Sequence, residues 1–376
     1  MWFLRADTFI GISLISLVLA LCGRLRFLSD KARMNVLALL CNLFVGWVDW
    51  RLLLFYLVYI AAIFGFSRIS PEGKRLKGAV FITGCLICVL PLFFVRLWPA
   101  GQAIVVTGLA FSVLRGADIM YYVHYTNEKP DFMVLYNYML FVPALTAGPV
   151  FRYRDFKRAA EELKPVNTPD FTAAVKRMIR GLFKSIVAAK LLMEVFEHFS
   201  KPGEPYTLPV SALLVVSSYM ILFFNLSGYA DIAIAMGRLC GFIVPENFKK
   251  PWKAASFTQF WRSWHSTVSD WIREHVYILL HNKRLSKVKS AGIALVVMVV
   301  MALWHGFTVP FLTTGLYLGV LLAAENLLGL TSPGKKWTPK RVLRCFVVNF
   351  LFGINTLLFI TDFRTALDIV LGLFRL

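Results

Sequence analysis

Residues 290–306 read SAGIALVVMVVMALWHG, an apolar run that ends in a tryptophan, a histidine and a glycine. The run follows a cluster of four basic residues: Lys283, Arg284, Lys287 and Lys289. An apolar run with basic residues at one end is typical of a helix that crosses a membrane from its cytoplasmic side. At 1.5 Å per residue, His305 is expected ~20–24 Å along this helix, past the middle of a hydrocarbon core about 30 Å thick.

Similar apolar segments recur along the whole chain. Of its 376 residues, 58% are hydrophobic and 16% are charged, and the mean hydropathy is +0.66. Charged residues make up about a quarter of a typical soluble domain. We therefore predict an all-α polytopic membrane protein, with one integral membrane domain over residues 1–376, and no β-barrel. The expected location is the cell (inner) membrane, with multiple passes.

The apolar segments predict about ten spanning or re-entrant helices. Spans are expected at 8–22, 35–66 (two helices broken near residues 47–50), 78–97, 101–114, 208–224, 226–243, 290–308, 310–330, 342–360 and 365–376. Residues 136–150 are short and broken by Pro143 and Pro149, which predicts a re-entrant segment. The charged residues 152–164 predict amphipathic helices on the cytoplasmic face. The stretch 248–271, rich in Trp and basic residues, is expected to enter the cytoplasmic side without crossing.

The chain has a formal net charge of +20. In a soluble protein this charge indicates a nucleic-acid partner. Here it is spread over several loops and forms no aromatic-laced face, which favours cytoplasmic retention of the loops and no nucleic-acid binding. Cys85 and Cys88 form a C-x-x-C pair inside an apolar run, with no His or second pair nearby, so no metal site is predicted.

Two histidines occupy positions where an apolar helical protein has little use for an ionisable group. His305 is a candidate proton carrier, because imidazole titrates near neutral pH; the alternative is a structural histidine hydrogen-bonded between helices. His265, in FWRSWH at 260–265, enters from the cytoplasmic interface and on its own would be an interfacial residue. Asp231 is an acid in an apolar helix, and pairing with Arg238 or another arginine explains it as well as catalysis does.

Three stretches carry a family resemblance. They are AGPVFRYRDF at 147–156, the block from Gly228 through PENF (245–248) and FWRSWH to Tyr277, and LWHG (303–306) followed by GLY (315–317). In this order and spacing, over roughly residues 135–330, the sequence resembles the membrane-bound O-acyltransferase family. The similarity is to its bacterial branch, which includes alginate O-acetyltransferases and D-alanyl transfer proteins.

The resemblance implies a fold of helices around a central tunnel, with the acyl donor entering from the cytoplasm and the acceptor arriving from outside. It implies that His305 is the catalytic base and that His265 lines the same tunnel, so both are candidate catalytic residues. The basic residues independently predict His305 near the outer end and His265 near the inner end. The residues expected to contact substrate are Asn247, Arg262, Trp264, Trp304 and Asp231. Among these, Asn247 and Arg262, together with His265, are expected to position the donor or to stabilise the oxyanion.

The expected function is transfer of an acetyl group from a cytoplasmic thioester toward an extracytoplasmic polysaccharide. The donor would be acetyl-CoA or an acyl carrier protein, with no bound cofactor, and membrane lipid surrounds the chain. The resemblance also implies an extracytoplasmic SGNH-type acyltransferase as partner. Two alternatives remain: D-alanyl transfer from a carrier protein to a cell-envelope polymer, and a lipid or acyl-group transporter.

Overall fold

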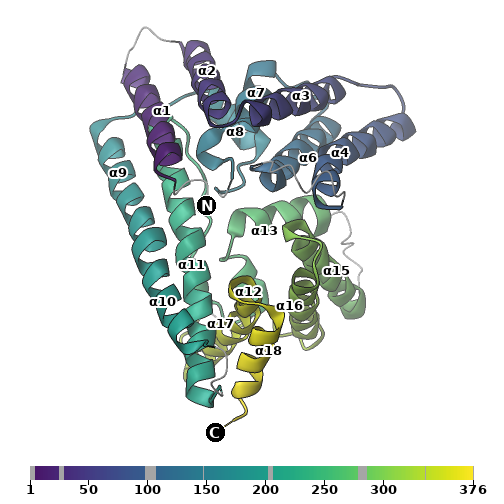
Figure 1. The fold of residues 1–376 in the computed structure, drawn as a ribbon. Coiled ribbons are helices and arrows are strands. Elements are labelled where there is room, and N and C mark those ends of the chain that lie inside the picture. The colour runs from purple at the N-terminus through teal and green to yellow at the C-terminus, as the bar shows by residue number, and fades with distance from the viewer. Residues whose placement is uncertain are drawn as a thin grey trace. The chain divides into compact units, whose positions relative to one another are not determined.

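A computed structural model describes residues 5–24, 29–97, 107–146, 148–201, 206–277, 286–334 and 336–375 of the chain. Every regular element in these ranges is a helix (Figure 1), which confirms the all-α prediction. The chain forms two compact units, residues 1–179 with 229–245 and residues 180–228 with 246–376. The expectation of a single membrane domain over 1–376 stays a prediction.

Seven of the described helices are long and apolar enough to cross a membrane. They are α2 (Asp30–Val48), α3 (Trp50–Ser67), α4 (Lys74–Leu97), α11 (Leu208–Leu239), α15 (Lys287–His305), α16 (Val309–Leu327) and α17 (Pro339–Ile360). A further helix, α1 (Ala6–Arg24), holds a shorter apolar stretch. The predicted break within 35–66 is confirmed. The Asp49 side chain accepts a hydrogen bond from the Arg51 backbone N–H at 2.9 Å and so caps α3.

Four predicted spans are not found as expected. Residues 208–224 and 226–243 belong largely to one 32-residue helix, α11, because no helix breaker lies between them. The span expected at 365–376 is α18 (Phe363–Gly372), whose 10 residues are too few to cross a bilayer. The span expected at 101–114 begins outside the described residues, and the described helix there is α6 (Leu109–Thr126).

In the first unit, α6 holds the segment that was predicted to be re-entrant. This segment consists of α7 (Phe132–Met139) and a 3-10 turn at Val142–Ala144, both buried. The buried Arg115 guanidinium donates to the carbonyl oxygens of Tyr138 and Met139, each at 3.2 Å, and to that of Ala144. Irregular backbone needs such partners in an apolar surrounding. The broken, short segment is therefore confirmed, while its insertion in the membrane stays a prediction.

The charged stretch that follows forms two helices, α8 (Tyr153–Glu161) and α9 (Thr168–Leu182). The start of α8 is fixed by Asp118 of α6, whose carboxylate accepts from the Tyr153 backbone N–H at 2.6 Å. A π-helical turn at Phe183–Ala188 leads from α9 into α10 (Ala189–Phe199). The first turn of α8 is thus anchored to α6, and its location at the membrane face stays a prediction.

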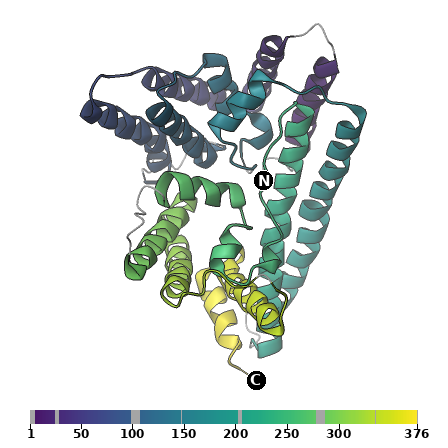
Figure 2. The ribbon, with the colours of Figure 1, turned by 180° about the vertical axis from the view of Figure 1, so that it is seen from behind.

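The second unit is built around a helical hairpin of α15 and α16, which lie side by side in both views (Figures 1 and 2). The two helices approach closely at Gly315, where an added Cβ would lie 2.8 Å from the Val299 Cα atom. Glycine at such a position allows backbones to pack together. Two short helices precede the hairpin, α12 (Phe257–Trp261) and α13 (Ser266–Ile272).

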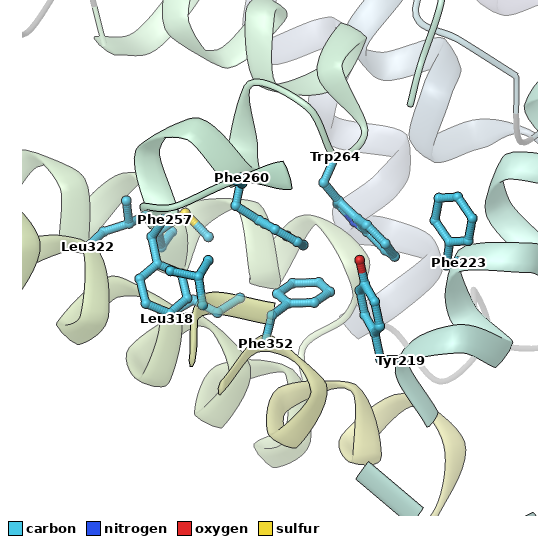
Figure 3. Packing of buried hydrophobic residues seen from close by; sticks show 11 residues of the cluster. Tyr219, Phe223, Phe257, Phe260, Trp264, Leu318, Leu322 and Phe352 are labelled. Atoms are coloured by element: carbon cyan, nitrogen blue, oxygen red, sulfur yellow. The ribbon is translucent and has the colours of Figure 1, made fainter. Parts of the chain in front are cut away.

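An aromatic cluster joins α12 to α11 and α17 in this unit. The Trp264 ring stacks on Phe260 and on Tyr219, with ring centroids 5.5 and 5.6 Å apart, and Phe352 lies 4.9 Å from it (Figure 3). Burying aromatic rings of this size supplies much of the packing energy of a core. The cluster therefore fixes the segment that carries His265, the residue after Trp264.

The hairpin generates a topology prediction. α15 begins at Lys287 and ends at His305, a length of ~27 Å at 1.5 Å per residue, so Lys287 and Thr308 lie at its opposite ends. Cysteine at position 308 should react with an impermeant maleimide from outside the cell, and cysteine at 287 only after permeabilisation. Both variants are made in a background that lacks the six native cysteines. Labelling of position 287 from outside refutes the orientation.

Candidate active site

A cavity of about 170 Å³ lies within the second unit. Its lining follows helical spacing: residues 298, 301, 302 and 305 on α15, and residues 352, 355 and 359 on α17. Most lining side chains are apolar or aromatic. The polar ones include His265, Ser269, His305, Thr314 and Asn355. Within the described part of the chain, no Asp, Glu, Lys or Arg lines this cavity.

His305 is the last residue of α15 and meets three aromatic rings. Ring centroids lie 4.7 Å away for Trp304 and 6.0 Å away for Phe311 and Phe359. The next residue, Gly306, leaves room for this arrangement, since a Cβ there would lie 2.5 Å from a Phe311 ring carbon. The Trp-His-Gly sequence therefore presents an imidazole at a helix end, with apolar rings holding its orientation.

His265 lies on the wall of the same cavity, in a turn between α12 and α13. Its backbone has φ 46° and ψ 44°, the left-handed region that costs a non-glycine residue ~1–2 kcal/mol. Asn247 holds this turn. Its backbone oxygen accepts from Ser266 N–H at 2.8 Å, and its Oδ1 accepts from the Thr267 hydroxyl at 2.8 Å. Strained backbone that neighbouring contacts fix in place is common at functional sites.

The structure places the two histidines on one cavity, and their depths in a membrane stay a prediction. The sequence predicted His305 near the outer end of a tunnel and His265 near its inner end. Both line the same cavity, which agrees with the shared tunnel that the resemblance implied. Burial lowers the pKa of the His265 imidazole to about 3, and the nearby His305 contributes to that lowering. His265 is therefore a neutral imidazole at physiological pH.

The predicted substrate-binding residues other than Arg262 fall into three groups. Trp264 and Trp304 line the cavity with the histidines. Asn247 is not among the lining residues, and its contacts position the His265 turn. Asp231 belongs to the first unit, where its carboxylate accepts from Arg177 at 2.9 Å. This is the pairing with an arginine of another segment that the sequence left open.

Arg262 lines a second cavity of about 290 Å³ in the same unit. Arg273 and Tyr277 lie on its wall as well. The two cavities share four lining residues: Trp261, Ser269, Met298 and Met301. The second cavity is thus an adjoining space that brings cationic side chains next to the apolar cavity of the histidines.

Sequence reasoning missed Glu325, a buried acid near the end of α16. Its carboxylate accepts from the backbone N–H groups of Phe257 and Thr258 at 2.7 and 2.8 Å, and from the Thr258 hydroxyl at 2.7 Å. These bonds satisfy the first turn of α12, whose free N–H groups favour an anion. The signal was available, because Glu325 is an acid in an otherwise apolar helix.

The pattern of MBOAT, the membrane-bound O-acyltransferase family, matches residues 123–352, which include both histidines. The chain belongs to this family.

The similar proteins are named for different acyl-transfer activities. The chain is 30% identical over 335 residues to a probable alginate O-acetylase of Pseudomonas fluorescens, covering 84% of this chain and 66% of that protein. It is 26% identical over 314 residues to a teichoic acid D-alanyltransferase of Bacillus subtilis, covering 76% and 78%. A peptidoglycan O-acetyltransferase of Helicobacter pylori is 30% identical over 199 residues, covering 50% and 37%. The chain therefore spans just under two thirds of the alginate-type relative.

The lowered pKa of His265 generates a stability prediction. The folded protein takes up this proton only near pH 3, whereas the unfolded chain takes it up near 6.5, so stability falls as pH falls through that window. His265→Gln removes this contribution. From pH 7 to pH 4.5 the detergent-solubilised variant should therefore lose less in Tm than the wild type. Parallel Tm curves for the two proteins contradict a depressed pKa.

Glu325 generates a second stability prediction. Glu325→Leu leaves three donors around α12 without their acceptor, and we expect a loss of ~2–4 kcal/mol, seen as a lower Tm. Glu325→Gln keeps one oxygen as an acceptor, so its Tm should lie between those of Glu325→Leu and the wild type. Glu274→Ala, at a side chain 41% exposed, is the control and should change little. A wild-type Tm for Glu325→Leu rules out the capping role.

Proposed function

We propose that this O-acyltransferase passes an acetyl group from a thioester donor to a hydroxyl group, on the way to an extracytoplasmic polysaccharide. The observation that carries the proposal is that His265 and His305 share one small apolar cavity. The alginate and peptidoglycan O-acetylating relatives support acetyl as the group and a glycan as the destination.

The composition of the cavity supports acetyl over D-alanyl. A D-alanyl group carries an ammonium, and burying an ammonium without a partner is costly. No carboxylate is found among the described residues that line the cavity. An acetyl group is uncharged and needs only apolar walls and a partner for its carbonyl oxygen. The D-alanyl alternative rests on the Bacillus subtilis relative, which covers a large share of both chains.

The chemistry divides between the two histidines. His305 accepts the proton of the attacking hydroxyl, whose oxygen forms a bond to the acyl carbon. The carbon–sulfur bond then breaks, the thiolate leaves, and the proton on His305 restores the free thiol. A positioned base of this kind contributes ~10²–10⁴-fold to the rate. His265, held neutral, orients the reacting groups by hydrogen bonding.

The adjoining cavity suits the remainder of the donor. Coenzyme A carries phosphates, and arginine binds phosphate through several N–H groups at once. Arg262 and Arg273 both line that cavity, and Arg273 also contacts Asp270 at 3.2 Å, which offsets part of its charge. Arg262 is therefore the better phosphate ligand of the two.

The location and partners follow from the same proposal. Seven candidate spans and the family's membrane-bound character support a multi-pass protein, and we place it in the cell (inner) membrane. The attacking hydroxyl can belong to an SGNH-type acyltransferase outside the membrane, which then delivers the acetyl group to the glycan. An acyl carrier protein is the alternative donor.

The first test is His305→Ala in reconstituted vesicles supplied with acetyl-CoA and a hydroxyl acceptor. We expect turnover to fall at least ~10²-fold while acetyl-CoA binding is kept, because the residue acts on the proton and not on the donor. Release of free CoA thiol measures turnover, and isothermal titration measures donor binding.

Arg262→Ala provides the matched comparison in the same assay. It should raise the KM for acetyl-CoA and leave kcat closer to the wild-type value, since its phosphate contact is distant from the reacting carbon. Wild-type turnover by well-expressed His305→Ala protein would remove the basis of the mechanism.

A further inference from the structure

Two polar side chains on the wall of the histidine cavity have no part in the mechanism described so far. Thr314 and Asn355 are 5% and 3% exposed, and both line this cavity. Among the described residues, neither the Thr314 Oγ1 atom nor the Asn355 Oδ1 atom has a hydrogen-bond partner. An unpaired buried polar atom costs ~1–3 kcal/mol, so nearly all such atoms are paired in folded proteins. The Thr314 hydroxyl would gain a partner by donating to a polar ligand inside the cavity. The Asn355 Nδ2 amide can donate to the same ligand, whereas its Oδ1 atom accepts.

Both residues lie one helical turn from the rings that surround His305. Phe311 stacks on His305, and Thr314 follows it by three residues on α16. Phe359 also meets His305, and Asn355 precedes it by four residues on α17. Residues three or four apart share a helix face and are separated by ~5–6 Å along the axis. The two polar groups therefore come from different helices to about the same level beside His305.

The rotation of α17 is fixed by its contact with α11. The Thr356 hydroxyl lies 2.8 Å from the Ser218 hydroxyl, and an added Cβ at Gly353 would lie 2.9 Å from a Val215 methyl carbon. Gly353 and Thr356 thus face α11, and Asn355 is turned about 100° from Thr356, toward the cavity. On α16, the close contact of Gly315 with α15 fixes Thr314 in the same way.

We infer that Thr314 and Asn355 bind the carbonyl oxygen of the acyl group and stabilise the oxyanion that forms on it. This inference rests on the proposed acetyl transfer. When the hydroxyl oxygen attacks the acyl carbon, the carbonyl π electrons move onto the acyl oxygen, and they return when the carbon–sulfur bond breaks. The attacking hydroxyl gives its proton to His305, so the acyl oxygen is the atom that needs donors.

The chemistry of the two side chains fits this role. A threonine hydroxyl and an asparagine amide both donate hydrogen bonds without carrying charge. Donors already aimed at a developing oxyanion need no reorganisation during the reaction, and removing one typically costs ~10²–10³ in kcat. No arginine or lysine among the described lining residues competes for this task.

The test uses the full chain in vesicles with acetyl-CoA as donor. Thr314→Val and Asn355→Leu keep the side-chain volume and remove the polar atoms. Each should lower kcat by ~10²-fold, while Tm stays unchanged or rises because a buried unpaired polar atom is gone. Thr314→Ser, which keeps the hydroxyl, should retain most of the activity. Thr313→Val is the neighbouring control, since the Thr313 hydroxyl already bonds to the Val309 carbonyl oxygen at 3.0 Å.

A binding measurement separates carbonyl recognition from turnover. S-ethyl-CoA lacks the carbonyl oxygen, and the analogue of acetyl-CoA with a methylene in place of sulfur retains it. The wild type should bind the carbonyl-containing analogue about tenfold more tightly, an order of magnitude expected for one or two buried hydrogen bonds. Thr314→Val and Asn355→Leu should each lose most of this preference.

Three results overturn the inference while the proposed function stands: wild-type kcat in both variants, loss of activity matched by an equal loss of Tm, or an unchanged preference between the analogues. A wild-type protein that neither transfers acetyl nor binds either analogue refutes the proposed function itself. That result is distinct, because it appears before any variant is made.

Discussion

The candidate site depends on one buried carboxylate. Glu325 accepts three hydrogen bonds from Phe257 and Thr258 at the start of α12, a helix of 5 residues whose N-cap is Ser256. A helix this short is unstable alone, because its first N–H groups lack partners. Glu325 lies on α16, which also carries Thr314. A single helix therefore anchors the turn that bears His265 and supplies part of the cavity wall.

Aromatic packing around Trp264 then fixes the turn that carries His265. The Trp264 ring is held by Phe260, Tyr219 and Phe352, and the next residue adopts the left-handed conformation. Asn247 closes the turn from the other side. Because the strain at His265 is resisted by contacts on both sides, its imidazole is held in one orientation. Groups that are already held in the reacting geometry need little reorganisation during the reaction.

Much of the fold was predictable because its signals are local. Apolar runs gave the positions of α2, α3, α4, α15, α16 and α17, and Asp49 marked the break between two of them. The continuous α11 was missed because its 32 residues exceed the length of one span, and no local sequence feature indicates that the helix continues. Thr314 and Asn355 were missed because a lone polar residue in an apolar helix does not reveal what it faces. The spacing of residues 352, 355 and 359 would have placed Asn355 on one face with two aromatic rings.

The shared cavity also gives the two histidines an electrostatic relation that a position at separate depths would not. His305 helps to lower the pKa of His265, and a charge on either ring disfavours a charge on the other. Once His305 has taken the proton of the attacking hydroxyl, no carboxylate among the described lining residues stabilises the imidazolium. In the proposed mechanism, transfer of this proton to the leaving thiolate therefore lowers the free energy. In this mechanism, the apolar wall thus favours return of the proton from His305 to the leaving group within the same cycle.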